Sequence, residues 1–366
     1  MNTYSFAPKW YVMAKPVGAR CNLRCDYCYY LHSSDSTSCA CIERVDEVAT
    51  HRWLEEYIRQ YVQLTPEHNE VVFCWHGGEP LLRPLSFYKE VVRLQRPYTA
   101  NYTISNVIQT NGTLLTDDWC AFFHDEGWKV GVSIDGPEHI HNRYRNHSFQ
   151  QVMEGIERLF RHQVDYTLMA VITDYSAQYP HEVYDFLTRL GSPFLQFEPQ
   201  CEQGSVGQVS AEAFGAFYNT LFDTWYERQD MGRVYIDLFD TTLALLMGYP
   251  SPSCIYSERC GNAPVVEKNG DVYCCDHYVP QARLGNLLDT PLLHLVMDER
   301  MQAFGAQKMP VAASCKACPF LSLCYGGCPR HRDSRGINRL CEGYQAYFQH
   351  TLPYFQEMAA VIRERL

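Results

Sequence analysis

The sequence has little that would direct this chain into or across a membrane. It begins MNTYSFAPKWYVMAKP, without the charged and then apolar segments of a signal peptide. No window has the roughly 18 consecutive apolar residues that a membrane span needs. Low-complexity tracts and internal repeats are lacking as well. We therefore expect a cytoplasmic protein that has no membrane partner.

Positive charge is also scarce. The 31 Lys and Arg residues stand against 42 Asp and Glu residues, which gives a formal net charge of −11. Such a field repels nucleic acid and anionic membrane surfaces, so we expect neither as a partner. At 366 residues, 46% of them hydrophobic, the chain is long enough to bury a large core in one long or two ordinary domains.

Cysteine, in contrast, is abundant, with seventeen residues. In a cytosolic protein, reducing conditions make metal binding a better explanation for this abundance than disulfides. Eight of the nine cysteines from Cys254 to Cys341 fall at fixed-looking spacings. Their spacings decide which metal the sequence predicts.

Strand-like and helix-like segments alternate along the first two-thirds of the chain. The predicted strands are Trp10–Met13, Val71–Trp75, Tyr102–Ile108, Lys129–Ile134, Tyr166–Ile172 and Phe194–Phe197. The predicted helices are Val48–Gln63, Leu85–Leu94, Asp117–Glu126, Phe149–His162, His181–Leu190 and Ala211–Arg228. This alternation predicts an α/β fold with a parallel sheet, curled into a partial (β/α)6 barrel that is similar to a TIM barrel. We expect its chemistry at the C-terminal ends of the strands.

The character of the chain changes after about Val234, where Pro, Gly and Cys become dense. This segment is too rich in turns to bury a large core, and metal clusters would supply the missing cross-links. The last residues, Gln345–Leu366, have the pattern of an amphipathic helix. We therefore predict a core domain at 1–234, a cysteine-rich domain at 235–345 and a terminal helix at 346–366.

The first cysteine motif follows the first predicted strand and consists of Cys21, Cys25 and Cys28. Three thiolates at this spacing can hold a four-iron cube and leave its fourth iron without a protein ligand. An open position is what a catalytic metal site needs. A zinc or disulfide knot is the alternative, but three cysteines alone do not close a tetrahedral zinc site.

With Tyr27 before its last cysteine, this motif resembles that of the radical S-adenosylmethionine (SAM) superfamily. The resemblance implies that the open iron binds the amino and carboxylate groups of SAM. An electron from the cluster then breaks a C–S bond of SAM and yields a 5′-deoxyadenosyl radical.

Other segments strengthen the resemblance to that superfamily. His76 to Pro80 resembles the Gly-Gly-Glu segment that contacts the amino group of SAM, Ser133 lies in a segment that resembles a ribose-binding one, and Arg145 stands where relatives contact the carboxylate. Taken alone, these would be a turn, a strand-end cap and a solvated arginine. The resemblance implies the following SAM-binding residues: Tyr27, Tyr30, His76, Gly77, Gly78, Glu79, Ser133 and Arg145.

The later cysteines resemble the SPASM extension of peptide-modifying radical enzymes, with seven cysteines and Gly270 in register. The resemblance implies two further four-iron clusters. One would be bound by Cys254, Cys260, Cys275 and Cys328, and the other by Cys315, Cys318, Cys324 and Cys341. Two four-cysteine zinc sites are the alternative, since thiolates suit both metals. Six cysteines are left over: Cys39, Cys41, Cys74, Cys120, Cys201 and Cys274.

Motifs over nearly the whole chain resemble those of anaerobic sulfatase-maturating enzymes. They are Lys15-Pro16, the first cysteine motif, Gly77–Leu81, Gln109–Gly112, Ser133–Pro137, Gly270–Val279 and Gly326–Arg332. Members of that family oxidise a cysteine or serine of a sulfatase to Cα-formylglycine. The resemblance implies an unfolded or nascent sulfatase as substrate, a low-potential electron donor such as ferredoxin or flavodoxin, three [4Fe–4S] clusters and Asp276 as the catalytic base.

Two further interpretations stay open at this point. A related maturase of ribosomal peptides, which forms thioethers or cross-links or epimerises residues, would use the same clusters. A non-catalytic iron–sulfur or zinc protein would have the cysteines without the reaction. The chain also departs from the family, because His76 stands where relatives often carry Gln.

Overall fold

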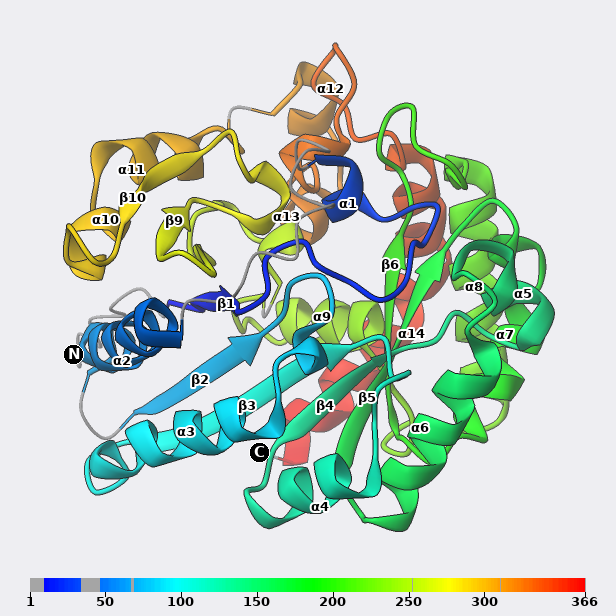
Figure 1. Cartoon of the computed structure of the whole chain (residues 1–366). Coiled ribbons are helices and arrows are strands. Elements are labelled where there is room, and N and C mark those ends of the chain that lie inside the picture. The colour runs from blue at the N-terminus through cyan, green and yellow to red at the C-terminus, as the bar shows by residue number, and fades with distance from the viewer. Residues whose placement is uncertain (1–9, 34–46, 67–68, 252, 310, 366) are drawn as a thin grey trace.

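The computed structural model describes residues 10–33, 47–66, 69–251, 253–309 and 311–365, and one twisted sheet runs through it (Figure 1). Within these ranges the strands are β1 (Met13–Lys15), β2 (Glu70–Trp75), β3 (Thr103–Thr110), β4 (Lys129–Ser133), β5 (Asp165–Ile172), β6 (Phe194–Pro199), β7 (Tyr235–Ile236), β8 (Val265–Glu267), β9 (Asp271–Tyr273) and β10 (Arg283–Asn286). They are ordered β10-β9-β8-β1-β2-β3-β4-β5-β6-β7 across the sheet.

Strands β1 to β7 are all parallel to their neighbours, which confirms the predicted partial barrel. The strand predictions were accurate except at the start. There, β1 begins at Met13 because Met13 and Ala14 are the residues that pair with Cys74 and Trp75 of β2. The two-residue β7 was not predicted, since it is too short to show a pattern.

The cysteine-rich region continues the same sheet, which the sequence did not predict. β8 pairs in parallel with β1, with Met13 opposite Val265 and Lys15 opposite Glu267. β8, β9 and β10 then form antiparallel pairs. The central position of β1 joins the barrel to the cysteine-rich region through backbone hydrogen bonds on both of its edges.

Helices cover the outer face of the barrel, and the cysteine-rich elements lie together at one end (Figure 1). In the described ranges the α-helices are α1 (Tyr29–Ser33), α2 (Glu47–Leu64), α3 (Leu85–Gln95), α4 (Asp117–Asp125), α5 (Glu138–Tyr144), α6 (Phe149–Arg161), α7 (Pro180–Thr188), α8 (Ala211–Glu227), α9 (Asp237–Leu246), α10 (Leu292–Val296), α11 (Glu299–Ala306), α12 (Ala313–Lys316), α13 (Leu321–Cys324) and α14 (Cys341–Arg365). Large side chains such as Trp53, Trp75, Trp128, Tyr88 and Phe123 fill the space between helices and sheet.

The terminal helix α14 begins at Cys341, earlier than the predicted Gln345. Asn338 ends the preceding loop. Its side-chain oxygen accepts a hydrogen bond from Leu340 N at 2.8 Å, and its carbonyl oxygen accepts one from Cys341 N at 2.9 Å. α14 packs along α8, where Gly343 and Gly215 allow the two backbones to approach closely. The helix therefore connects its first residue, a cysteine, firmly to the barrel.

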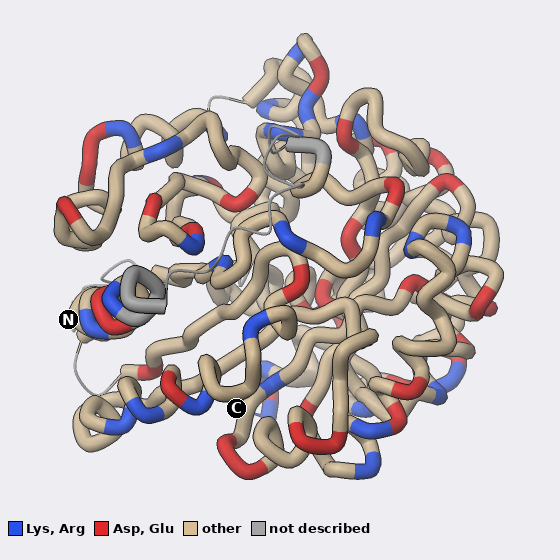
Figure 2. The backbone as a smooth tube through the Cα atoms, in the orientation of Figure 1, with Lys and Arg blue, Asp and Glu red and all other residues tan. Residues whose placement is uncertain are grey.

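Charged residues of both signs are mixed along the outer helices, while the strands at the centre carry few (Figure 2). Among the described helices, none combines the length and the apolar character that a membrane crossing requires.

We predict that Gly343→Ala weakens the packing of α14 on α8. A Cβ at this position would lie 2.2 Å from the backbone oxygen of Ala211. Overpacking of this kind costs about 1–3 kcal/mol. The measurement is the midpoint of thermal unfolding under anaerobic conditions, which we expect to fall. Glu342→Ala, an exposed change one residue earlier, is the control. Equal midpoints for the two variants would contradict the prediction.

Candidate active site

A cavity of about 440 Å³ lies where the C-terminal ends of the strands meet the cysteine-rich region. We call it the central cavity. Residues from both regions line it, including Cys25 and Gly77 from the barrel and Cys254 and Asp276 from the cysteine-rich region. As expected for a parallel α/β fold, most of the predicted site residues gather at this end of the sheet.

The first thiol group consists of Cys21, Cys25 and Cys28, in the loop between β1 and α1. All three line the central cavity. Burial is the main reason why the pKa of the Cys25 thiol is raised to about 12, and the nearby charges of Cys28 and Cys21 add to this effect. The sulfur of Cys21 accepts hydrogen bonds from Leu23 N at 3.4 Å and from Asn111 Nδ2 at 3.7 Å. The spacing in the sequence therefore does bring these thiols together.

Gly77 and Gly78 hold this cysteine loop in place. Gly78 N donates to Gly18 O at 2.8 Å, and a Cβ on Gly78 would lie 2.0 Å from the backbone oxygen of Arg20. Gly77 has a φ of +127°, a backbone conformation that residues with a side chain rarely adopt. Both glycines line the central cavity. Only glycine at these positions lets the backbone run between the cysteine loop and a ligand.

Glu79, which was predicted to contact SAM, is fully buried and lies behind the cavity wall. Its carboxylate accepts hydrogen bonds from Leu81 N at 3.0 Å, from the Thr110 hydroxyl at 2.8 Å and from Asn111 N at 2.8 Å. Burial raises its pKa to about 7. Glu79 thus fixes the loop that carries Asn111, which in turn contacts Cys21. The contact of Glu79 with SAM stays a prediction.

Arg145 belongs to a buried network with Asp135 and Tyr27. Its Nε donates to Asp135 Oδ2 at 2.9 Å, and the Tyr27 hydroxyl donates to the same oxygen at 2.5 Å. Burial would raise the pKa of Asp135, but the charge and hydrogen bond of Arg145 lower it on balance. Tyr27, Ser133 and Arg145 line the central cavity, as predicted. Asp135 was missed, although it lies two residues after Ser133.

Asp276 follows β9 and faces the central cavity from the cysteine-rich region. Its carboxylate forms an ion pair with Lys15 Nζ and accepts a hydrogen bond from the Tyr29 hydroxyl. Burial would raise the pKa of Asp276, but Lys15 holds it well below its usual range. Lys15 is itself fully buried at the end of β1. The sequence singled out Lys15 only as part of a family motif and did not predict this pair.

Tyr30 and His76 lie beside this ion pair and line the same cavity. Lys15 Nζ lies 3.4 Å from the centre of the Tyr30 ring, whose hydroxyl donates to Glu267. His76 Nδ1 accepts a hydrogen bond from Gly77 N at 2.7 Å, and burial lowers the pKa of His76. The imidazole is therefore neutral near pH 7, with its hydrogen on Nε2.

The second thiol group consists of Cys254, Cys260, Cys275 and Cys328, and all four line the central cavity. Burial raises the pKa of the Cys254 thiol to about 11, and the charges of Cys260 and Cys328 add to this effect. The charges of Cys254 and Cys328 help to raise the pKa of the Cys275 thiol, whereas the charges that affect the pKa of Cys274 are those of Arg300 and Asp298. The structure thus places Cys275, as preferred from the sequence, with the other three.

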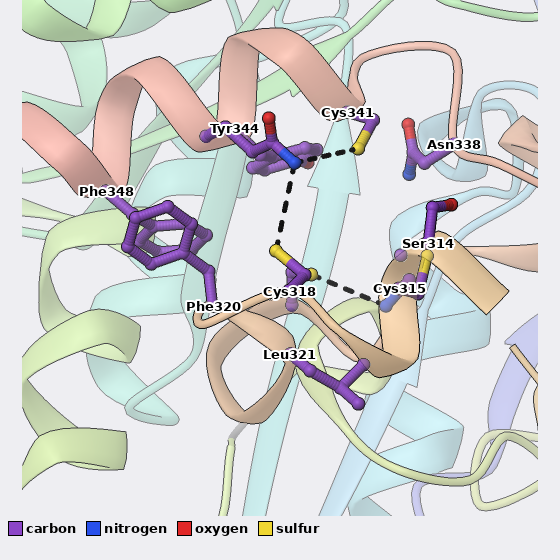
Figure 3. Close-up of a pocket in the computed structure, with 13 residues that line it drawn as sticks. Ser314, Cys315, Cys318, Phe320, Leu321, Asn338, Cys341, Tyr344 and Phe348 are labelled. Atoms are coloured by element: carbon purple, nitrogen blue, oxygen red, sulfur yellow. Dashed lines mark hydrogen bonds between the residues drawn. The ribbon is translucent and has the colours of Figure 1, made fainter. Parts of the chain in front are cut away.

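The third thiol group consists of Cys315, Cys318, Cys324 and Cys341, which surround a separate cavity of about 50 Å³ (Figure 3). The cysteines come from α12, α13, the turn between them and the first residue of α14. Phe320, Tyr344 and Phe348 cover one side. Burial raises the pKa of the Cys341 thiol to about 11, and the other three thiols add to this effect. The four cysteines, of which the first and the last are 26 residues apart, thus surround one cavity.

These three groups fit clusters by the chemistry of their donors. Every cysteine in them is a free thiol, and the thiols of each group influence one another electrostatically. Buried thiolates that lie close together repel one another unless a cation offsets their negative charge. The iron ions of a cluster supply that positive charge. Among the described residues, no set of three or more His, Cys, Asp or Glu is placed to hold a single metal ion. Cys39 and Cys41 lie outside the described ranges.

The partial barrel with three thiols after its first strand defines a radical SAM enzyme. The sequence model of the radical SAM superfamily matches residues 16–187, and that of SPASM, an iron–sulfur cluster-binding domain, matches residues 254–319. The chain is 43% identical to the serine-type anaerobic sulfatase-maturating enzyme of Bacteroides thetaiotaomicron, over 97% of this chain and 93% of that one. The chain belongs to the family of anaerobic sulfatase-maturating enzymes.

Two other relatives are similar over their whole length. The cysteine-type enzyme of Clostridium perfringens is 32% identical, over 97% of this chain and 100% of that one. A solved structure of native anSMEcpe with bound AdoMet and the Kp18Cys peptide has a TM-score of 0.85 and 32% identity, over 95% of this chain and 98% of that one. The fold therefore agrees with that of the family.

We predict that Cys315→Ala removes one cluster and leaves the other two. The iron content of anaerobically reconstituted protein would fall by about a third, because one of three four-iron clusters loses a ligand. Cys120→Ala is the matched control, since Cys120 is buried in α4, away from all three groups. Iron analysis is the measurement. A Cys315→Ala protein with as much iron as Cys120→Ala would disprove the assignment.

Proposed function

We propose that this enzyme oxidises a serine or cysteine side chain of a sulfatase to Cα-formylglycine under anaerobic conditions. The observation that carries the proposal is the central cavity, where the first thiol group and Asp276, which is paired with the buried Lys15, face the same space. The reaction needs both a source of radicals and a group that takes a proton from the same substrate side chain. Membership of the family supports this reaction over the ribosomal-peptide and non-catalytic alternatives.

We assign the cofactors to the groups of residues described above. The first thiol group would hold the SAM-binding cluster, and the second and third thiol groups would hold one SPASM cluster each. SAM would lie against Tyr27, Tyr30, His76, Gly77, Gly78, Ser133 and Arg145, which line the central cavity. When bound, SAM and the first cluster supply the radical that takes a hydrogen from the substrate Cβ, and the SPASM clusters accept the remaining electron.

We assign the role of base to Asp276. Its two oxygens are held by Lys15 and Tyr29, so the carboxylate cannot turn away from the cavity. Either oxygen retains a lone pair that can accept the proton of the substrate hydroxyl or thiol. The positive charge of Lys15 keeps the carboxylate ionised although the Asp276 side chain is mostly buried. His76 lines the cavity beside Asp276 and can contact the substrate or SAM.

The substrate is proposed to be an unfolded or nascent segment of the sulfatase. Asp276 and the first thiol group lie inside the cavity, and a side chain on a folded protein surface would not reach them. Gln196, Glu198 and Gln200, at the end of β6, line the cavity and offer polar groups to an extended peptide. The peptide complex of anSMEcpe supports this view.

We also propose a low-potential electron donor such as ferredoxin or flavodoxin, because reductive cleavage of SAM needs an electron. We further propose a cytoplasmic location. All the cysteines within the described ranges are free thiols, which suits a reducing compartment.

The function is tested with a peptide bearing the sequence Cys/Ser-x-Pro/Ala-x-Arg. Reconstituted enzyme, reductant and SAM are incubated anaerobically with serine and cysteine versions of the peptide. We expect a mass loss that corresponds to aldehyde formation in at least one of them, together with 5′-deoxyadenosine. Production of 5′-deoxyadenosine without any aldehyde from either peptide would contradict the proposal.

The base is tested with Asp276→Asn. The amide keeps the size of the side chain but accepts a proton poorly, so aldehyde formation should fall by about a hundredfold or more. SAM cleavage should persist, because it does not need the base. Asp271→Asn is the control, since Asp271 on β9 pairs with Arg283 away from the cavity. Full product from Asp276→Asn would remove Asp276 from the mechanism.

A further inference from the structure

Gln345 lines the cavity of the third thiol group and is exposed on its solvent side. It lies one helical turn after Cys341 on α14 and is exposed to solvent. Long polar side chains on such a face usually extend into water. The side chain of Gln345 instead folds back over the cysteines, since residues four apart on a helix lie above one another.

The amide nitrogen of Gln345 lies over two of the four sulfurs. Its Nε2 donates to Cys341 Sγ at 3.7 Å and to Cys318 Sγ at 3.8 Å. The dashed lines that reach the sulfurs of Cys318 and Cys341 in Figure 3 mark these contacts. A third sulfur, that of Cys324, accepts a hydrogen bond from Gly326 N at 3.4 Å. Three of the four presumed ligands therefore accept an N–H group.

Hydrogen bonds to cysteine sulfurs are among the factors that set the reduction potential of an iron–sulfur cluster. An N–H donor stabilises negative charge on sulfur, and that charge is greater after the cluster has gained an electron. A donor thus raises the potential and makes the cluster a better electron acceptor. Cys341 also lies at the first residue of the 25-residue helix α14, whose N-terminal dipole acts in the same direction.

We propose that Gln345 tunes the reduction potential of the cluster held by the third thiol group, and so sets how readily this cluster accepts the electron released by substrate oxidation. The inference rests on the cluster assignment under the proposed function. Gln345 is a positioning residue, since it acts through the cysteines and does not reach the central cavity. Two properties favour this role over simple filling of the surface. The amide of Gln345 bridges two different ligands, and those ligands come from different elements, the turn after α12 and the first residue of α14.

The test uses three substitutions of Gln345 in the full-length, cluster-loaded protein. Gln345→Leu removes the donor, Gln345→Glu replaces it with a negative acceptor, and Gln345→Lys replaces it with a positive donor. The readout is a redox titration followed by electron paramagnetic resonance, using the signal that Cys341→Ala removes. We expect the potential to fall in the Leu variant, to fall further in the Glu variant and to rise in the Lys variant. At a fixed potential, the reduced fraction of this cluster should decrease several-fold in the Leu variant.

Gln349 provides the matched control, because it is the same residue type, exposed, one turn further along α14. Gln349→Glu and Gln349→Lys make the same charge changes without removing the contacts to sulfur, so their shifts should be clearly smaller. Iron analysis of each variant confirms that the cluster is present, and the Glu and Lys variants provide the answer if the Leu variant loses iron.

Two results would overturn the inference alone. One is a wild-type potential in iron-complete Gln345 variants, and the other is an equal shift in the Gln345 and Gln349 variants. A different result would overturn the cluster assignment as well, namely a Cys341→Ala protein with the iron content and resonance signals of the wild type. Failure of the inference and failure of the proposed cluster site are thus distinguishable.

Discussion

The buried ion pair between Lys15 and Asp276 is the contact on which the active site depends. Lys15 ends β1 of the barrel, and Asp276 follows β9 of the cysteine-rich region. Either charge without its partner would be strongly unfavourable in this interior, so the two regions are stable together only where the pair forms. Tyr29, which also binds Asp276, lies next to Cys28. The pair therefore sets the proposed base against the site of the first cluster.

Strand β1 makes this arrangement possible. It pairs with β2 on one edge and with β8 on the other, so the barrel and the cysteine-rich region share one sheet. The loop after β1 carries the first thiol group, and β8 and β9 lead to Cys275 and Asp276. Parallel pairing brings the carboxyl ends of β1 and β8 to the same edge. The central cavity arises at this edge, with walls from both regions.

Long elements and fixed spacings were predicted well, and contacts were not. The strands from β2 to β6 and the α-helices between them have five residues or more, which is long enough for a run of apolar residues or a helical period to show in the sequence. β7 to β10 have four residues or fewer, which is too short for a pattern. Glu79 shows what the motif did not predict, namely the three hydrogen bonds that its side chain accepts behind the cavity wall.

The sequence by itself determined the chemistry of the donors. The cysteine spacing in the loop after β1 predicted the first set, and the resemblance to the family implied the other two. The members of each set line a common cavity. Only the tertiary structure decided which side chains contact the predicted site residues. Lys15 pairs with Asp276, Asp135 accepts from Arg145, and Gln345 donates to Cys318 and Cys341. These contacts mostly join residues far apart in the chain. Their distances depend on how strands pair and helices pack, which no local pattern encodes.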